Sequence, residues 1–321
     1  MEAKKKTVIS RVFKVIGFTA LIAAIIVGAS FGFNIAGDNS TRSYEQRQIF
    51  REKDNTIDVL VLGNSGVHAG VSPMEMYAEY GFTSYDCSQS LQLPWESYQF
   101  LAETIEHQNL KVLALEVDQF FSTSRQRNRY GKLREYGIRA FPLYETHLGW
   151  KSIGEKNVRS VTKGYIYTYV KVPAKGNVFR QPTEEKYKMQ SDSERYLKKI
   201  YDLCEDKGIE LMLFEVPSAN GRWDNRKHNT ITEFAQAHEL NFVDMNDRIE
   251  ELGLDWKYDT RDKGDHLNYN GAVKVSKWLG KFLSENYGLE SRKGNPRYAH
   301  WDEDYAEYAK LVGRKSDGKK N

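Results

Sequence analysis

Short segments with strand character alternate along the chain with longer segments in which apolar residues recur at helical spacing. Most of the short segments are nearly continuous apolar runs, typical of strands buried on both faces of a parallel sheet. They are residues 57–62, 83–88, 111–117, 209–216 and 241–244. The helical segments are residues 73–81, 94–107, 191–207, 229–238 and 270–287. This order predicts an α/β domain with a central parallel sheet and right-handed crossovers.

One long segment interrupts the alternation. Residues 119–190 are rich in Arg, Lys and Tyr and exceed the length of a single crossover, which predicts an insertion, and long insertions are often functional. The alternating run Tyr165–Val170 predicts an edge strand or a hairpin. Five aromatic residues are candidates for lining a groove in which sugars stack, with packing of a cap onto the main domain as the alternative. They are Tyr136, Phe141, Tyr144, Trp150 and Tyr165.

An uncharged segment follows a basic one at the N-terminus. Residues 1–14 carry Lys and Arg, and residues 15–33 carry no charge. About 19 such residues span a bilayer core as a helix, and the basic flank favours the cytoplasmic side. The pattern predicts a cytoplasmic tail over 1–14, an uncleaved single-pass signal anchor over 15–36 and a stalk over 37–56, with the rest of the chain outside the cell membrane. Cleavage after the small residues 28–30 is the alternative.

Composition narrows the function classes further. The 321 residues are 40% hydrophobic, enough for a packed core, and the net charge of +3 does not predict nucleic-acid binding. Cys87 and Cys204 are predicted to be buried free thiols, with a disulfide as the alternative. Zinc spacing and phosphate-cradling glycine loops are absent from the sequence, so we expect no metal and no cofactor. In the charged tail 290–321, apolar side chains on one helical face are expected to pack on the domain.

A serine directly follows the first predicted strand. The apolar run ends at Gly63-Asn64-Ser65, which places the Ser65 hydroxyl past the carboxyl end of the strand, where open α/β sheets bind ligands. Gly63 permits a tight turn, and the Ser65 backbone N–H is placed to point at an oxyanion. Because Gly-x-Ser is also a common strand-to-loop turn, the motif indicates catalysis only together with a base.

A candidate base lies just ahead of the helix at 270–287. Residues 262–271 include Asp262, Asp265 and His266. A serine hydroxyl becomes a good nucleophile when a base takes its proton, and that base needs a carboxylate to fix its tautomer. We therefore predict Ser65 as nucleophile, His266 as base, and Asp262 or Asp265 as the orienting carboxylate.

This arrangement resembles the SGNH/GDSL hydrolase superfamily, in which Ser follows the first strand and Asp and His precede the last helix. Residues 63–73 are most similar to its membrane-anchored branch, which includes the D-alanyl-lipoteichoic acid transfer protein and polysaccharide O-acyltransferases. The resemblance covers roughly residues 55–287 and implies a three-layer, flavodoxin-like fold for a domain over 57–289. The family's carboxylate precedes His by three residues, where this chain has Lys263. Asp262, with Gly264 absorbing one extra residue, fits that spacing better than Asp265.

The resemblance also implies the groups around the nucleophile. A donor to the oxyanion is expected in the loop after the second strand, at Ser88 and Gln89, although the family's glycine is missing there. Gly63 and Asn64 complete the expected oxyanion and substrate site, with Asn64 in place of the family's aspartate. The family's Gly-x-Asn-Asp block is replaced by residues 116–118, and His68 is a candidate second imidazole near the pocket.

Together these features imply a membrane-anchored, extracytoplasmic acyl transferase or esterase. Its substrate would be a cell-envelope polysaccharide or teichoic acid, acylated or deacylated through an acyl-enzyme on Ser65. A multi-pass membrane acyltransferase is a candidate partner. The alternative is a non-catalytic scaffold on the same fold that binds an envelope polymer or such an acyltransferase.

Overall fold

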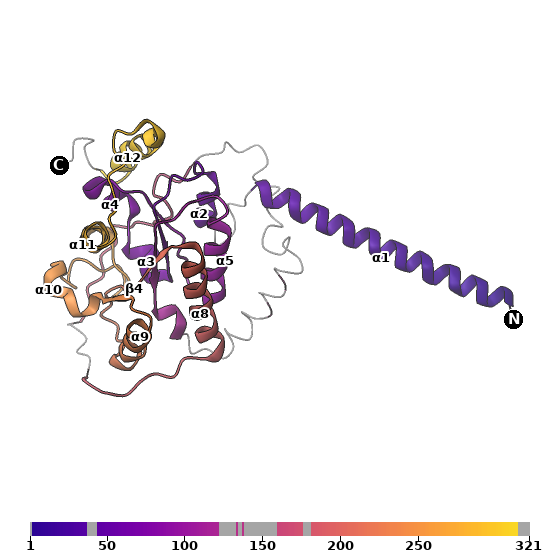
Figure 1. The fold of residues 1–321 in the computed structure, drawn as a ribbon, viewed down its shortest axis with the longest axis horizontal. Helices are drawn as coiled ribbons and strands as arrows, with labels where there is room; N and C mark the ends of the chain where they lie inside the picture. The colour runs from indigo at the N-terminus through magenta and orange to yellow at the C-terminus, as the bar shows by residue number, and fades with distance from the viewer. Residues whose placement is uncertain are drawn as a thin grey trace. The chain divides into compact units, whose positions relative to one another are not determined.

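Five strands form one parallel sheet (Figure 1). The computed structural model describes residues 2–36, 44–121, 133, 137, 159–175 and 181–313. The strands are β1 (Val59–Leu62), β2 (Ser84–Asp86), β3 (Val112–Glu116), β4 (Glu210–Glu215) and β5 (Asn241–Asp244). Their order is β2-β1-β3-β4-β5, and all neighbouring pairs are parallel. This is the flavodoxin-like order, so the predicted α/β fold class is confirmed.

Helices cover both faces of the sheet. In β1, Leu60 and Leu62 belong to an apolar cluster with residues of α5 (Pro94–Thr104), α8 (Ser191–Lys207) and α9 (Asn225–Ala237). Val59 and Val61 point the other way, into a cluster with residues of α3 (Ser65–Gly70) and α11 (Tyr269–Asn286). Because successive strand side chains alternate between faces, both faces must be apolar, and the sheet becomes the middle of three layers.

The strand order reverses at β1. This strand pairs with β2 on one side and β3 on the other, so that Val59 is opposite both Ser84 and Val112. In open α/β sheets the crevice beyond the carboxyl ends of the strands at such a reversal is the usual ligand site. The residues that follow Leu62 and Glu116 therefore line the position where a site is expected.

The predicted helices are present with small shifts at their ends. Helix α4 (Pro73–Tyr80), α5, α8 and α11 lie close to their predicted ranges. Helix α9 begins earlier than predicted, because the Asp224 side chain caps it by accepting from the N–H groups of Arg226 and Lys227. Further helices in the described residues are α2 (Tyr44–Arg47), η1 (Gln48–Arg51), η2 (Asp118–Phe121), η4 (Met245–Arg248), α10 (Ile249–Leu252), η5 (Pro296–Tyr298) and α12 (Ala299–Leu311).

Helix α1 (Glu2–Ala36) contains the apolar segment expected near the N-terminus. Within it, Ile9–Gly28 is long and apolar enough to cross a membrane. The segment begins before residue 15 because Ile9, Val12 and Phe13 are apolar and outweigh the intervening charges. A signal sequence near an N-terminus has the same length and composition, so α1 is either an anchor or a signal segment.

Part of the expected stalk and the expected tail is folded onto the domain. Ile49 is 1% exposed, and the Lys163 side chain is fully buried between Glu52 and Asp304, with Nζ–O distances of 2.7 and 2.6 Å. Asp304 lies on α12, whose Trp301 is also fully buried and stacks under the Lys163 ammonium. The predicted packing of the tail is thus confirmed, and within residues 45–56, expected to be stalk, Gln46, Gln48, Ile49, Glu52 and Thr56 are buried. Both cysteines, Cys87 and Cys204, are buried and free, as predicted.

The segment 165–170 is not the edge strand or hairpin that its alternation predicted. Its backbone is bonded to loops and helix ends instead: Ile166 N–H donates to His68 O at 3.1 Å, and Tyr269 N–H donates to Thr168 O at 2.8 Å. Further along, Val172 exchanges bonds with the loop that holds His266, accepting from Lys263 N–H at 2.9 Å. The alternation reflects a segment that is buried at some positions and exposed at others, without a regular partner strand.

Tyr165 does not line a groove. Its side chain is 1% exposed and belongs to the apolar cluster that α5 and α8 also join. Burial raises the pKa of the Tyr165 phenol well above its usual value. The other aromatic candidates, Tyr136, Phe141, Tyr144 and Trp150, lie outside the described residues, and so does much of the insertion over 119–190.

Candidate active site

Ser65 stands at the first turn of α3, directly beyond β1. The Asn64 side chain caps this helix by accepting from Gly66 N–H at 2.8 Å. Gly63 is crowded, because a Cβ there would lie 2.7 Å from Glu116 Cβ and 2.5 Å from a methyl group of Val67. The glycine therefore permits close packing of β1's end against its neighbours, rather than a left-handed turn.

The loop that carries His266 doubles back on itself. Lys263 and Gly264 both have left-handed backbones, with φ of 66° and 95°. Thr260 Oγ1 lies inside the turn, where it accepts from Gly264 N–H at 2.7 Å and donates to His266 O at 2.9 Å. A Cβ at Gly264 would approach Ala219 Cβ at 2.7 Å, so only glycine fits. This turn accommodates the one extra residue between Asp262 and His266.

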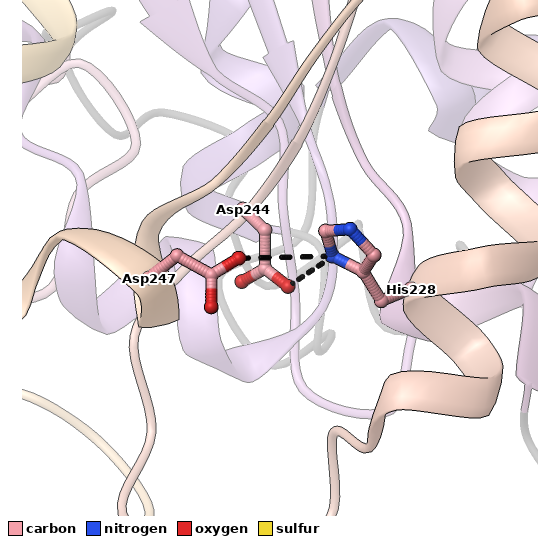
Figure 2. A group of neighbouring side chains, drawn as sticks. All are labelled: His228, Asp244 and Asp247. Carbon is pink, nitrogen blue, oxygen red and sulfur yellow. Dashed lines mark hydrogen bonds and ion pairs between the residues drawn. The ribbon is translucent and has the colours of Figure 1, made fainter. Parts of the chain in front are cut away.

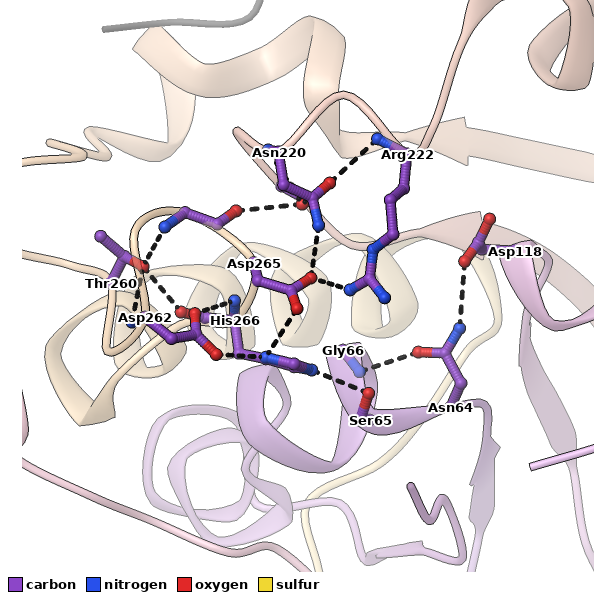
Figure 3. Close-up of polar contacts among 12 residues, drawn as sticks. Asn64, Ser65, Gly66, Asp118, Asn220, Arg222, Thr260, Asp262, Asp265 and His266 are labelled. Atoms are coloured by element: carbon purple, nitrogen blue, oxygen red, sulfur yellow. Dashed lines mark hydrogen bonds and ion pairs between the residues drawn. The ribbon is translucent and has the colours of Figure 1, made fainter. Parts of the chain in front are cut away.

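Ser65, His266 and Asp262 form one chain of hydrogen bonds (Figure 3). His266 Nε2 lies 2.7 Å from Ser65 Oγ, across 201 residues of sequence. His266 Nδ1 lies 2.5 Å from Asp262 Oδ2, and the other oxygen of Asp262 accepts from His266 N–H at 2.7 Å. The carboxylate thus fixes both the ring and its backbone, which leaves Nε2 to face the serine.

Asp265 takes a different position. Its nearer oxygen is 3.5 Å from His266 Nδ1, beyond hydrogen-bond distance. It instead forms an ion pair with Arg222 and accepts from the side-chain amide of Asn220, both in the loop after β4 (Figure 3). Of the two carboxylates left open by the sequence, Asp262 is the one that contacts the imidazole.

The surroundings of His266 favour its neutral form. Burial lowers its pKa below the usual 6.5, and the nearby charges of Arg261 and Arg222 lower it further, whereas the hydrogen bond and charge of Asp262 raise it. At neutral pH the imidazole is therefore unprotonated and able to accept a proton at Nε2.

The expected oxyanion groups are only partly available. The Asn64 side chain donates to Glu116 and Asp118 at 3.1 and 3.3 Å, and the Asn64 backbone N–H donates to Glu116 at 3.2 Å. Ser88 N–H donates to Asp86 at 2.8 Å. Gln89 is buried, and its side-chain oxygen has no partner among the described residues. The Ser65 N–H remains a candidate donor to an oxyanion, whereas the unpartnered Gln89 oxygen is an acceptor and cannot take that role.

A group of buried acids beneath Asn64 was not predicted as functional. Glu116 and Glu215 end strands β3 and β4, both fully buried, and the Asp118 N–H donates to each at 3.0 and 3.1 Å. Burial raises the pKa of Glu116 to about 8, and burial together with the charge of Glu116 raises the pKa of Glu215 well above its usual value. Their position at the ends of predicted strands was the one signal in the sequence that pointed to a functional role. It was not sufficient, because glutamates also occur at the ends of ordinary strands.

His68 lies near the site without joining the hydrogen-bond chain. It is 8% exposed, and its Nδ1 has no partner in the described part of the chain. Burial lowers its pKa to about 4, and the charges of Arg261 and His266 act in the same direction, which places it close to both. His68 is therefore a neutral imidazole behind the nucleophile.

Within the described residues, two groups of side chains have the composition of metal ligands. One is Asp262, Asp265 and His266 themselves, where a metal on Nδ1 would displace the bond to Asp262. The other is His228, Asp244 and Asp247, at the end of β5 (Figure 2). In it, His228 Nδ1 lies 2.8 Å from Asp244, whose same oxygen also accepts from Trp223 Nε1–H at 2.6 Å. Hydrogen bonding within the protein accounts for that arrangement.

Comparisons with known proteins give low-identity structural matches. No family model and no curated protein sequence matches this chain. Solved structures similar to it include an acetyl xylan esterase, with 12% identity, 71% of this chain and 98% of that chain covered, and a TM-score of 0.39. A lipase/acylhydrolase from Enterococcus faecalis has 10% identity, coverage of 74% and 100%, and a TM-score of 0.41. A GDSL-like lipase from Bacteroides thetaiotaomicron has 10% identity, coverage of 76% and 98%, and a TM-score of 0.40. The fold described above rests on the strand order and pairing of this chain itself.

Proposed function

We propose that this chain is a serine esterase or acyl transferase of the SGNH type, with Ser65 as nucleophile. The observation that carries the proposal is the hydrogen-bond chain from Ser65 Oγ to His266 Nε2 and from His266 Nδ1 to Asp262. A hydroxyl, an imidazole and a carboxylate in this order are the arrangement that activates serine for acyl transfer. The site lies at the carboxyl ends of the strands, where a substrate has access.

The proposed reaction has two steps, acylation of Ser65 and transfer of the acyl group to an acceptor. Ser65 Oγ attacks the ester carbonyl while its proton passes to His266 Nε2, and Asp262 stabilises the imidazolium that forms. The tetrahedral intermediate collapses, the leaving alcohol takes the proton from His266, and an acyl-Ser65 remains. A second hydroxyl then gives its proton to His266 and attacks the acyl group. When this tetrahedral intermediate collapses, Ser65 Oγ leaves and takes the proton back from His266. With water as acceptor the product is an acid, and with a sugar hydroxyl it is a new ester.

The N-terminal segment adds a cellular location to the proposal. The basic segment before residue 15 and the apolar run Ile9–Gly28 support an N-terminal anchor with the domain outside the cell membrane. An extracytoplasmic acyl transferase would act on a cell-envelope polysaccharide or teichoic acid, with a multi-pass membrane acyltransferase as the partner that delivers acyl groups. A reporter fused after residue 321 tests this topology, and activity of the reporter only in the cytoplasm would exclude it.

Covalent labelling of Ser65 tests the chemistry most directly. A fluorophosphonate reacts with an activated serine, and mass spectrometry locates the adduct. We expect labelling on the peptide that contains Ser65, loss of labelling in Ser65→Ala and strong reduction in His266→Ala. Ser84→Ala is the control and should leave labelling of Ser65 in place, because Ser84 is buried at the start of β2 and lies outside the hydrogen-bond chain. If envelope acylation in cells is fully restored by Ser65→Ala, the chain is the non-catalytic scaffold instead.

A further inference from the structure

Arg222 is held at the rim of the candidate site by contacts to both its backbone and its side chain. Its N–H donates to Asn220 Oδ1 at 2.9 Å, and its carbonyl accepts from Lys227 Nζ at 2.6 Å. One terminal nitrogen of the guanidinium contacts Asp265 Oδ1, the oxygen that Asn220 also contacts. A surface arginine usually samples many rotamers, whereas the backbone of this one is held by Asn220 and Lys227 and its guanidinium by Asp265.

The guanidinium keeps most of its hydrogen-bonding capacity. Its side chain is 53% exposed, and within the described residues the contact to Asp265 is its one side-chain interaction. Asp265 in turn lies 3.5 Å from His266 Nδ1, so the exposed edge of the guanidinium lies two contacts from the imidazole (Figure 3). Arginine presents five donors in a planar fork that matches a carboxylate or a phosphate.

A cation in this position opposes the catalytic step when the site is empty. His266 must become positively charged as it takes the serine proton, and Arg222 and Arg261 both disfavour that charge. Arg261 lies beside Asp262, with its Nε 3.9 Å from the carboxylate. An anion bound by the guanidinium would offset this repulsion during turnover, so the arrangement favours substrates that bring a negative charge.

We infer that Arg222, fixed by Asp265, is the binding residue of a subsite for an anionic group on the substrate, a carboxylate or a phosphate a few atoms from the ester. The inference rests on the proposed function, because the subsite is defined relative to the ester that Ser65 attacks. It also assigns a role to Asp265, which orients the arginine rather than the imidazole. A simpler role for the Arg222–Asp265 pair is to tie two loops together, and the experiment must separate the two.

Three acetyl esters provide matched probes. They are 1-acetyl-glycerol, which is neutral, 1-acetyl-glycerol 3-phosphate, and 3-acetoxybutyrate, which carries a carboxylate. We expect higher kcat/KM for at least one anionic ester than for the neutral one. In Arg222→Gln this preference should fall by roughly tenfold or more, because a hydrogen bond to a charged group contributes about 1.5–3 kcal/mol. Arg222→Lys should keep part of it, since it retains the charge without the fork.

Arg195→Gln is the matched control. Arg195 has the same 53% side-chain exposure and a similar ion pair, to Asp192, but it lies on α8. It should leave the preference in place. Equal loss of turnover on all three esters in Arg222→Gln would assign the pair to loop tethering and overturn the inference, as would a wild-type protein without any preference. Preference for the phosphate or for the carboxylate ester identifies which anion the subsite takes.

A binding measurement separates failure of this inference from failure of the proposed function. Ser65→Ala protein is titrated with glycerol 3-phosphate and with 3-hydroxybutyrate by calorimetry, and the titration is repeated with Arg222→Gln added. We expect the added substitution to weaken binding of the preferred anion by about tenfold. If fluorophosphonate does not label Ser65 but this binding is seen, the catalytic proposal fails while the anion site stands. If labelling succeeds and neither anion binds in an Arg222-dependent way, the subsite is wrong.

Discussion

The side-chain amide of Asn64 donates to Glu116 at 3.1 Å and thereby joins the turn that holds Ser65 to the end of β3. The same amide reaches Asp118 at 3.3 Å, while its oxygen caps α3. An aspartate, which the resembled family has at this position, would satisfy the cap but could not donate to Glu116 and Asp118 as the Asn64 amide does. The asparagine is thus explained by its acidic neighbours.

Asn64→Asp should therefore be destabilising, in spite of its nearly identical shape. It replaces two donated hydrogen bonds by repulsion, and we expect a loss of about 1–3 kcal/mol in the free energy of unfolding. Adding Glu116→Gln supplies a donor that faces the new carboxylate. Urea denaturation of both single variants and the double variant should show the double to be more stable than the sum of the single effects predicts. Strict additivity would mean that residues 64 and 116 do not interact.

The buried glutamates make stability depend on pH. Glu215 holds its proton in the folded protein above the pH at which the unfolded chain, with a pKa of 4.5, has lost it. The folded state then binds more protons, so the free energy of unfolding falls as pH rises from about 4.5 towards the raised folded pKa. In Glu215→Gln the neutral amide mimics the protonated acid, and this fall above about pH 4.5 should be smaller.

Glu116→Gln is the matched control for that measurement. Glu116 accepts hydrogen bonds from Asn64 and Asp118 on its two oxygens, so an amide NH₂ in place of one oxygen should destabilise the protein at every pH. Thermal unfolding of both variants across the same pH range distinguishes the two glutamates. Because the pKa of Glu116 is itself raised to about 8, its substitution should also reduce the fall, and the loss at every pH distinguishes it from Glu215→Gln. Identical profiles for the two variants would mean that the hydrogen bonds to Glu116 do not contribute to stability.

The strands could be predicted from the sequence for one physical reason. Apolar runs such as 57–62 and 209–216 are buried on both faces, which local composition records directly. The orienting carboxylate could not be decided in that way, because it depends on the left-handed backbone of Lys263 and Gly264, which brings Asp262 back onto His266. The roles of Glu116 and Arg222 could not be predicted from the sequence either, since both depend on contacts with residues distant in sequence.

A segment within the insertion shows how alternation misleads. Tyr165–Val170 alternates like a strand, but its backbone partners belong to α3 and to the start of α11, and Tyr165 is core. Periodicity reports which side chains are buried, whereas a strand also requires a neighbour with regular spacing. The ion pair of Lys163 with Asp304 likewise joins segments 141 residues apart, which no local pattern records.

Lys163→Met should strongly destabilise the domain. Methionine fills the space but leaves Glu52 and Asp304 without their shared cation in a buried position, which typically costs about 3–5 kcal/mol. Lys186→Met is the control: its ion pair with Glu233 has a similar 2.6 Å distance, but both side chains are more than half exposed, and we expect a loss below about 1 kcal/mol. Chemical denaturation measures both. Similar losses in the two variants would show that α12 is not held by the buried pair.

The last prediction separates the two aspartates beside His266 by rate and by pH. Asp262→Asn should lower kcat by roughly 10³–10⁴-fold, because the imidazole loses the partner that fixes its tautomer, whereas Asp265→Asn should act mainly through Arg222 and cost less. Wild-type kcat/KM should fall on the acid side with an apparent pKa below 6.5, as burial, Arg261 and Arg222 lower the pKa of His266. Asp262 raises that pKa, so the residual activity of Asp262→Asn should have its acid limb at still lower pH. Steady-state rates on one ester from about pH 4 to pH 9 test both expectations. A larger loss in Asp265→Asn would reverse the assignment of the orienting carboxylate.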